Sequence, residues 1–294
     1  MTEKYIDLHT HSNASDGSCT PSELFNLASE CGLAAVALTD HDTVGGIPEF
    51  LKAAEKSSSC EAVPGVEISV DLAGNEVHIV GLFIDYQCQS LLKLLTEIRV
   101  NRDSRNSVII GKLQTMGYDI TIKEVNDIAG GDSVGRPHFA KILIDKGYFS
   151  EPQAVFERCL KRGASAYCPR KLPSPEEAIR EIHNAGGLAF WAHAVYRLKN
   201  ERYFVRRTIK KLLNSGLDGV EAYYSTFSPV QQKMMIEFAA EYNLLRSGGS
   251  DFHGSNQPSI SMGIGTDGNL RVPAEILAEI KEKIKCKKET SQAS

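Results

Sequence analysis

The stretch Asp7-Leu8-His9-Thr10-His11 places two imidazoles and a carboxylate at every second position of an expected strand. Because strand side chains alternate between two faces, positions 7, 9 and 11 point the same way. Neutral imidazole is the commonest metal ligand in proteins, so two histidines that converge on one point suggest a bound metal ion. The alternative for this stretch is an edge strand whose histidine rings are solvated.

Further histidines and carboxylates recur where other strands are expected to end. Functional groups collect at the carboxyl ends of strands in parallel α/β folds. After His9 and His11, the chain carries Asp16 in the next loop, His41 after the strand 33–38, Glu67 late in 61–70, His78 in 76–83, His193 after 188–192, and Asp251 and His253 after 244–248. Six of the eight histidines lie at these places, a concentration that random placement does not explain.

Strands and helices alternate along most of the chain. Thr20-Pro21-Ser22-Glu23 and Ser174-Pro175-Glu176-Glu177 each combine an N-cap hydroxyl, a proline and a glutamate, as in a helix with a capping box. Gly74-Asn75 predicts a turn between two adjacent strands. This alternation predicts an α/β architecture with a largely parallel sheet, open or closed into a barrel.

Between residues 89 and 171, strand patterns nearly disappear from the sequence. Helical stretches such as 91–116 and 138–146 dominate there, and glycines separate them. We therefore expect a discontinuous α/β domain made of residues 1–88 and 172–294, with a helical insertion at 89–171. The insertion is expected to form a lid over the active site.

Composition limits the classes of function. The chain has 294 residues, 42% of them apolar, and a formal net charge of −4, which argues against a general nucleic-acid or membrane-surface binder. Seven cysteines, odd in number and without a C-x-x-C pair, indicate reduced thiols. The start of the chain lacks a signal-peptide pattern, and no 18-residue apolar run exists. We expect a cytoplasmic protein without a membrane partner.

The candidate ligands are all nitrogen and oxygen donors. Such a set suits manganese, iron(II) or zinc in a hydrolytic site better than structural zinc. Nine ligands are too many for one ion and about right for two or three, which commonly share a bridging carboxylate. Glu67 is the best candidate for that bridge, because it is expected deep in the mouth of the sheet.

Taken together, these motifs resemble those of the polymerase and histidinol phosphatase (PHP) superfamily. The resemblance rests on 7-DLHTHS-12, Asp16-Gly17, 38-LTDHD-42, 65-GVE-67, 192-AHA-194 and 250-SDFH-253. It implies a distorted (β/α)7 barrel with three metal ions. By position, His9, His11, Glu67 and Asp251 would hold one ion, Glu67, His78 and His193 the second, and Asp16, His41 and His253 the third.

Within that superfamily, Gly135-Arg136-Pro137-His138 resembles an element of the stand-alone nucleotide phosphoesterases. The resemblance implies hydrolysis of a nucleotide phosphate monoester, such as a nucleoside 3′,5′-bisphosphate or AMP, or of short RNA 5′ ends. We expect a metal-bridging hydroxide to attack the phosphorus. Arg136 would clamp a phosphate at a helix N-terminus, and His138 would donate to that phosphate or to a leaving oxygen. The expected partner is therefore a phosphorylated small molecule or short oligonucleotide, without a stable long nucleic acid.

Three alternatives remain open for the activity. Histidinol-phosphate phosphatase shares the metal motifs but does not predict the G-R-P-H element. A metal-binding PHP module without catalysis could act as a scaffold. Deaminase or amidohydrolase chemistry would need a differently placed acid or base.

Some residues near the motifs have less certain roles. We expect Asp7, Asp40 and Asp42 to orient histidines rather than bind metal. Glu221 could support the ligands in the same way. Tyr223, Tyr224 and Phe227 could stack on a base or belong to the core, and His183 is expected at the surface.

Overall fold

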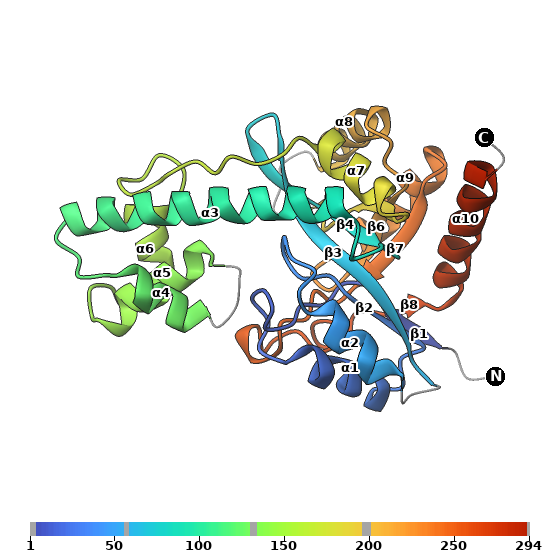
Figure 1. The fold of residues 1–294 in the computed structure, drawn as a ribbon, viewed down its shortest axis with the longest axis horizontal. Coiled ribbons are helices and arrows are strands. Elements are labelled where there is room, and N and C mark those ends of the chain that lie inside the picture. The colour runs from blue at the N-terminus through green and yellow to red at the C-terminus, as the bar shows by residue number, and fades with distance from the viewer. Residues whose placement is uncertain (1–3, 56–58, 130–133, 196–200, 293–294) are drawn as a thin grey trace.

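The computed structural model describes residues 4–55, 59–129, 134–195 and 201–292 (Figure 1). Its strands are β1 (Tyr5–Asp7), β2 (Ala35–Leu38), β3 (Glu61–Leu72), β4 (Asn75–Leu82), β5 (Leu188–Trp191), β6 (Gly219–Tyr224), β7 (Leu245–Gly249) and β8 (Val272–Pro273). Its α-helices are α1 (Pro21–Glu30), α2 (Ile47–Ala54), α3 (Gln89–Thr115), α4 (Ile122–Ala129), α5 (Arg136–Asp145), α6 (Pro152–Val155), α7 (Pro175–Asn184), α8 (Glu201–Asn214), α9 (Pro229–Glu241) and α10 (Glu275–Gln292). A π-helical turn at Phe156–Leu160 extends α6, and Gly254–Asn256 form a short 3₁₀ turn.

The described strands form one sheet in the order β7-β6-β5-β4-β3-β2-β1-β8. The backbone N–H of Leu8 donates to the carbonyl of Gly248 at 3.0 Å, so the segment after β1 meets the end of β7. A parallel bridge between Thr10 and Phe252 continues this contact. The sheet is therefore a nearly closed barrel, which confirms the α/β prediction and agrees with the barrel that the PHP resemblance implies.

The barrel departs from a purely parallel sheet in one sector. β3 pairs with β4 antiparallel, through the turn at Ala73 and Gly74, and β4 pairs with β5 antiparallel as well. The neighbouring pairs β1–β2, β2–β3, β5–β6 and β6–β7 are parallel. The two-residue β8 adds an eighth, antiparallel strand beside β1, beyond the seven that the resemblance implies.

Local sequence signals account for the helix starts. The side chain of Thr20 accepts from the backbone N–H of Glu23, and Glu23 accepts from Thr20 in return, which is the predicted capping box of α1. Ser174 and Glu177 make the same pair at the start of α7. Both predictions are confirmed.

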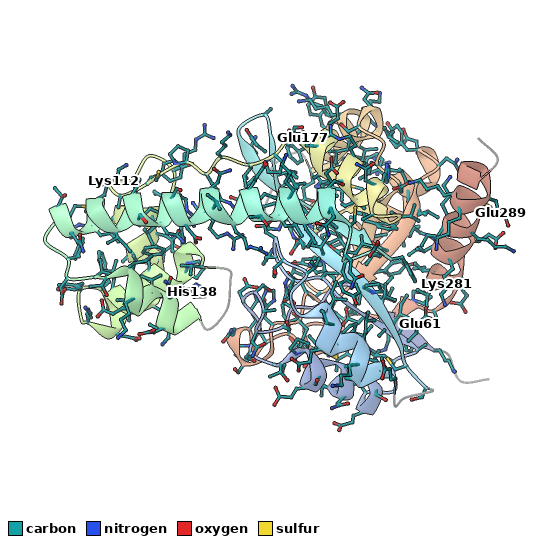
Figure 2. All side chains as sticks on the ribbon, in the orientation of Figure 1. Glu61, Lys112, His138, Glu177, Lys281 and Glu289 are labelled. Atoms are coloured by element: carbon teal, nitrogen blue, oxygen red, sulfur yellow. The ribbon has the colours of Figure 1, made fainter. Side chains whose placement is uncertain are left out.

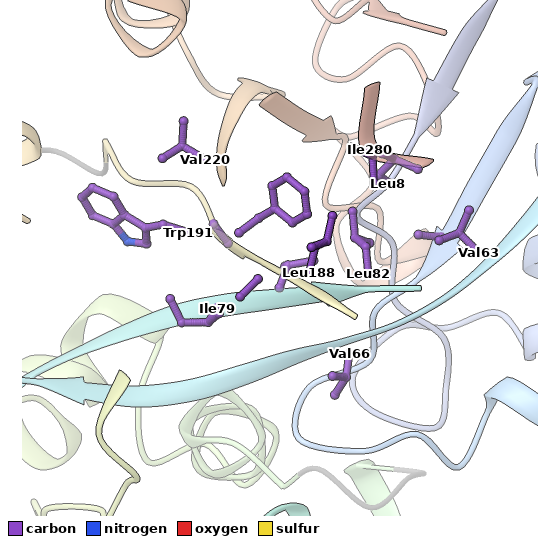
Figure 3. Close-up of a cluster of buried hydrophobic side chains, with 14 of the residues drawn as sticks. Leu8, Val63, Val66, Ile79, Leu82, Leu188, Trp191, Val220 and Ile280 are labelled. Carbon is purple, nitrogen blue, oxygen red and sulfur yellow. The ribbon is translucent and has the colours of Figure 1, made fainter. Parts of the chain in front are cut away.

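Two hydrophobic cores are present in the described chain. The larger fills the barrel and the layer of helices around it, and includes Leu8, Val63 and Trp191 (Figure 3). The smaller joins α3, α4, α5, α6 and the chain that follows them, with Phe139 and Leu143 fully buried. Figure 1 shows this second unit beside the barrel, with the long α3 running from one to the other.

The two cores meet within α3. Leu91, Leu95 and Ile98 belong to the barrel core, whereas Ile109 and Leu113 belong to the second core. The helix is thus shared between the two units. The division of domains at residues 89 and 171 stays a prediction, as does the lid.

At the opposite side of the barrel, α10 packs along the strands. Figure 2 shows Lys281 of α10 next to Glu61 of β3, and their charged groups lie 2.5 Å apart. Among the helices described, none is both long enough and apolar enough to cross a membrane.

Candidate metal centre and arginine-lined cavity

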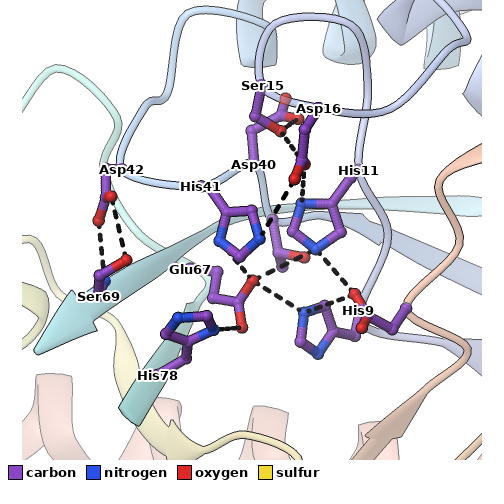
Figure 4. Close-up of polar contacts among 12 residues, drawn as sticks. His9, His11, Ser15, Asp16, Asp40, His41, Asp42, Glu67, Ser69 and His78 are labelled. Carbon is purple, nitrogen blue, oxygen red and sulfur yellow. Dashed lines mark hydrogen bonds and ion pairs between the residues drawn. The ribbon is translucent and has the colours of Figure 1, made fainter. Parts of the chain in front are cut away.

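Glu67 lies at the centre of the cluster that the sequence predicts (Figure 4). Its Oε2 is 2.9 Å from Nδ1 of His41 and 3.3 Å from Nε2 of both His9 and His11. Its Oε1 is 2.9 Å from Nδ1 of His78 and from Nε2 of His193. One fully buried carboxylate therefore contacts five imidazoles from four segments of the barrel, since His9 and His11 share one segment.

Two aspartates complete the cluster. Oδ1 of Asp251 lies 3.1 Å from Nε2 of His11 and 3.5 Å from Nε2 of His9. Oδ1 of Asp16 lies 3.2 Å from Nε2 of His253 and 3.8 Å from Nδ1 of His11. Oδ2 of Asp16 lies 3.8 Å from Nε2 of His41. The structure thus brings all nine predicted residues into one connected group, which we call the histidine cage.

The backbone around the cage is less regular than expected. β1 ends at Asp7, so His9 and His11 lie in an extended segment beyond the strand instead of inside it. That segment is still held by hydrogen bonds, because Asp251 N–H donates to the His9 carbonyl and His11 N–H to the Phe252 carbonyl, both at 2.9 Å. The two imidazoles converge as the alternation predicts, with ring centroids 5.2 Å apart.

Shifted pKa values indicate which sign of charge the cage stabilises. Burial alone would lower the pKa of His11, but Asp251 and Glu67 raise it to about 10. Burial would raise the pKa of Glu67, yet His41, His78 and His9 hold it well below its usual range. The carboxylates therefore stabilise positive charge at the centre of the cage, which protons or metal cations can supply.

Orphaned buried atoms point to metal rather than protons alone. Within the described chain, five buried cage atoms have no hydrogen-bond partner: Nε2 of His9, Nδ1 and Nε2 of His11, Nδ1 of His41 and Oε2 of Glu67. Native proteins rarely leave such atoms unsatisfied. Three subsets offer ligand atoms within 4.8 Å of one another: His11, Asp16, His41 and His253; His9, His11 and Asp251; and His41, Glu67 and His78. The cage fits divalent metal ions.

A small cavity of about 150 Å³ adjoins the cage. Asp16, His41 and His78 form its cage side. The opposite wall holds four arginines: Arg102 and Arg105 of α3, Arg136 at the start of α5, and Arg170 from the segment before α7. We call this space the arginine cavity; it is smaller than the roughly 300 Å³ of typical drug-sized ligand sites.

Asp42 holds two of these arginines, Arg102 and Arg170, through hydrogen bonds. Its fully buried carboxylate accepts from Arg102 and, at 2.5 Å, from Arg170. It also accepts from the backbone N–H and hydroxyl of Ser69, as Figure 4 shows. The backbone of Asp42 is left-handed, with φ of 54°.

Arg105 and Arg136 differ from that pair. No described carboxylate lies within ion-pair distance of either side chain, and Arg105 donates to the neutral Asn106. Only 7% of Arg105 is exposed. Burial, together with Arg170, Arg102 and Arg136, lowers its pKa to about 10. Glu76 also lines the cavity and forms an ion pair with Arg170 at 3.3 Å. A bound anion would offset the charge of the remaining guanidinium groups.

His138 lies next to the cavity rather than in its wall. Its Nδ1 accepts from the backbone N–H of Gly135 at 3.0 Å, so the ring is tied to the start of its own helix. Figure 2 places it on the side of the helical unit that faces the barrel. Burial lowers the pKa of His138, and the neutral ring carries its proton on Nε2.

Asp7, Asp40 and Asp42, which are expected to orient histidines, accept hydrogen bonds from hydroxyl, backbone and guanidinium groups. Asp7 accepts from Ser250 and Gly263, Asp40 from Ser12 and Ser15, and Asp42 from the arginines. No hydrogen bond joins any of the three carboxylates to an imidazole in the described chain, although Asp7 also accepts from the backbone N–H of His9 at 3.4 Å. That they orient the histidines stays a prediction. Glu221 takes the expected role, with Oε1 3.0 Å from Nδ1 of His9.

Sequence reasoning missed three of the four arginines. Arg99, Arg102 and Arg105 recur every third residue of α3, which places them along one side of a helix. That spacing was the available signal. Because these arginines are far from the cage motifs in the sequence, the spacing alone did not predict that they lie beside the cage in the structure. His183, expected at the surface, is partly buried, and its Nε2 lies 2.6 Å from Asp218.

Comparisons with known proteins agree with this geometry. Residues 7–168 match the model of the PHP domain. A 5′-3′ exoribonuclease of Haemophilus influenzae is 37% identical over 86% of this chain and 91% of its own length. A 3′,5′-nucleoside bisphosphate phosphatase of Chromobacterium violaceum is 33% identical over 88% and 90%.

A solved structure from Bifidobacterium adolescentis, described as a metal-dependent phosphoesterase, superposes with a TM-score of 0.81. It is 28% identical and covers 94% of this chain and 95% of its own. The likeness therefore extends through the barrel, the long α3 and the helical unit. The cage, the fold and these relatives together show that the chain belongs to the PHP family.

Proposed function

We propose that this protein is a metal-dependent phosphoesterase that hydrolyses a phosphate ester of a nucleotide. The observation that carries this proposal is the contact between two opposite charge environments. A cage suited to cations shares its wall with a cavity lined by four arginines. A phosphorylated substrate needs both, since its reacting phosphoryl group must approach the cations while a remaining negative group needs its own counter-charge.

We further propose that the cage holds three divalent ions, with manganese first and iron(II) or zinc as alternatives. The nine cage residues would hold these ions, with the carboxylate of Glu67 shared between them. Divalent ions there supply positive charge to the phosphoryl oxygens and lower the pKa of water. The carboxylates raise the pKa of His11 and His78 to about 10, so these rings would release protons when they bind metal.

The chain's own residues orient the substrate. Arg136 and Arg105 have no carboxylate partner among the described residues, so Arg136 can donate to phosphate oxygens in the fork geometry that guanidinium favours. Arg105 uses Nε and Nη2 for Asn106, and its remaining N–H groups can donate to the same phosphate. Arg102 and Arg170, fixed by Asp42, add charge to the same wall. Because Nδ1 of His138 accepts from Gly135, its Nε2 carries the proton and can donate to a phosphate or leaving oxygen beside the cavity.

The substrates of the two relatives share one feature that fits this arrangement. A nucleoside 3′,5′-bisphosphate carries two phosphoryl groups on one ribose, and a 5′-phosphorylated RNA end carries the same pair at its first nucleotide. We propose that one group reaches the cage and the other enters the arginine cavity. The insertion around α4 and α5 would close over the nucleotide as a lid.

The test compares three phosphate esters. The protein loaded with Mn²⁺ is assayed for product release from adenosine 3′,5′-bisphosphate, a 5′-phosphorylated RNA oligonucleotide and histidinol phosphate. The proposal expects turnover of one or both nucleotides, with histidinol phosphate at least about ten-fold poorer. Preferred turnover of histidinol phosphate would support that alternative. Full metal loading without hydrolysis of any ester would instead support a scaffold role.

A further inference from the structure

We infer that β6, which supplies none of the nine cage residues, positions three of them through Glu221 and Tyr224. This inference rests on the proposed metal centre and extends it to residues outside the ligand set. Both side chains are almost fully buried, at 2% and 8% exposure. They contact His9, His193 and Asp251, which come from three different segments of the barrel.

A β-bulge explains how two residues three positions apart reach the same face. Glu221 pairs with Ser247, but the next pair is Tyr223 with Gly248, so Ala222 is an extra residue. In a regular strand, positions 221 and 224 would point to opposite faces. The extra residue restores the alternation, so Glu221 and Tyr224 both point toward the cage.

Glu221 determines which nitrogen of His9 faces the cage. Its Oε1 is 3.0 Å from Nδ1 of His9, and a carboxylate can only accept, so Nδ1 carries the proton. In the neutral ring, the other nitrogen, Nε2, then carries the lone pair. It is the orphaned atom that lies 3.3 Å from Glu67 and 3.5 Å from Asp251.

The second oxygen of Glu221 holds another part of the cage. Oε2 accepts from the backbone N–H of His193 at 2.6 Å. His193 has a φ of 31°, a conformation that costs free energy for a residue with a side chain. One carboxylate thus fixes the tautomer of His9 and the strained turn that directs His193 toward Glu67.

Tyr224 acts on the third residue. Its hydroxyl donates to Oδ2 of Asp251 at 2.8 Å, and its ring packs against His193 with centroids 5.5 Å apart. With Oδ2 occupied, Oδ1 is the oxygen that faces His9 and His11. Asp251 also has a left-handed backbone, with φ of 59°, so its orientation depends on such side-chain contacts.

The experiment measures metal affinity without substrate. Metal-stripped wild type, Glu221→Gln and Tyr224→Phe are titrated with Zn²⁺ against a chelating dye. Removing an outer partner of a metal ligand typically weakens binding 10- to 100-fold, and we expect a loss of about that size in both variants. Matched controls are Glu181→Gln, another buried glutamate, and Tyr223→Phe, the neighbouring buried tyrosine on the same strand. Both controls should keep wild-type affinity.

Nitrogen-15 NMR of the histidine rings provides a readout that simple destabilisation does not move. In the Zn²⁺-loaded wild type, His9 should carry its proton on Nδ1. In Glu221→Gln, the new amide can donate to Nδ1, so the proton should move to Nε2. Unchanged affinity in both variants, or an unchanged tautomer in a folded Glu221→Gln, would overturn the inference.

The Tyr224→Phe variant keeps the inference testable if Glu221→Gln does not fold, because it removes a single hydroxyl. Wild-type affinity in Tyr224→Phe alone would then overturn the positioning of Asp251. The proposed function fails separately. A wild type that binds metal and hydrolyses no phosphate ester would contradict the enzyme while leaving this inference intact.

Discussion

Glu67 concentrates the electrostatics of the centre in one side chain. It contacts five histidines and is fully buried, so its charge cannot be replaced by solvent. A neutral amide at this position would leave the imidazoles without their shared anion. The consequence is a cage that can no longer hold cations together.

We therefore expect Glu67→Gln to lower metal content by at least one ion per chain. Nucleotide hydrolysis should fall by more than about 100-fold, which exceeds the usual effect of an outer partner. Elemental analysis of the purified protein and initial rates at saturating Mn²⁺ measure the two effects. Glu181→Gln is the control for the same change at another buried position. Unaltered stoichiometry in the variant would remove Glu67 from the centre.

Arg105 allows a sharper test of substrate binding. A hydrogen bond to a charged group contributes about 1.5–3 kcal/mol, which corresponds to roughly a 10- to 150-fold change in binding. Arg105→Met should raise KM for adenosine 3′,5′-bisphosphate by that factor, with a much smaller effect on adenosine monophosphates. Steady-state kinetics with adenosine 3′,5′-bisphosphate and with the 3′- and 5′-monophosphates of adenosine measures the difference in KM.

Arg99→Met is the matched control for Arg105, since Arg99 lies on the same helix and contacts Thr43 instead of the cavity. It should keep the wild-type KM. Equal losses for bisphosphate and monophosphates in Arg105→Met would mean that the cavity does not bind the second phosphate.

At the scale of elements, the helix that follows Arg170 depends on its cap. Ser174 accepts from the N–H of Glu177, and such caps typically contribute about 0.5–2 kcal/mol. Ser174→Ala should lower the free energy of unfolding by about 1 kcal/mol. Ser107→Ala is the contrast, because Ser107 bonds back to the Asp103 carbonyl within α3 and has no capping role. Urea denaturation of both variants decides whether the cap is responsible.

The strand and helix pattern was readable from the sequence because local signals agree with burial. Apolar runs such as 35–38 became strands buried on both faces, and the capping boxes at Thr20 and Ser174 formed as expected. The cage residues were found because they share one chemistry and recur at strand ends. The bulge at Ala222 and the register that directs Tyr224 depend on pairing between distant segments, which local sequence does not encode.

The arginine cavity was not readable for the same reason. Arg102, Arg136 and Arg170 come from three segments separated by more than thirty residues each. Only the packing of α3 against both cores brings them to one wall. The motif around Arg136 was visible in the sequence, whereas its partners required the tertiary structure.

For the whole molecule, the two hydrophobic cores predict two levels of stability. Phe139 is fully buried in the second core, and such phenylalanines typically cost about 3–5 kcal/mol when replaced by alanine. Phe139→Ala should therefore speed hydrogen exchange between residues 109 and 168 while the barrel strands keep their protection. Metal content should stay at the wild-type level. Equal acceleration in β2 and β3 would show one cooperative unit.

We propose that the histidine cage and the arginine cavity form one phosphoesterase site. The most direct measurement is a crystal structure of the Mn²⁺-loaded protein with AMP and inorganic phosphate, with the ions located by anomalous scattering. Manganese peaks are expected among the nine cage residues, with one phosphate group beside them and another on Arg105 and Arg136. Manganese outside the cage, or both phosphate groups away from the arginines, would contradict it.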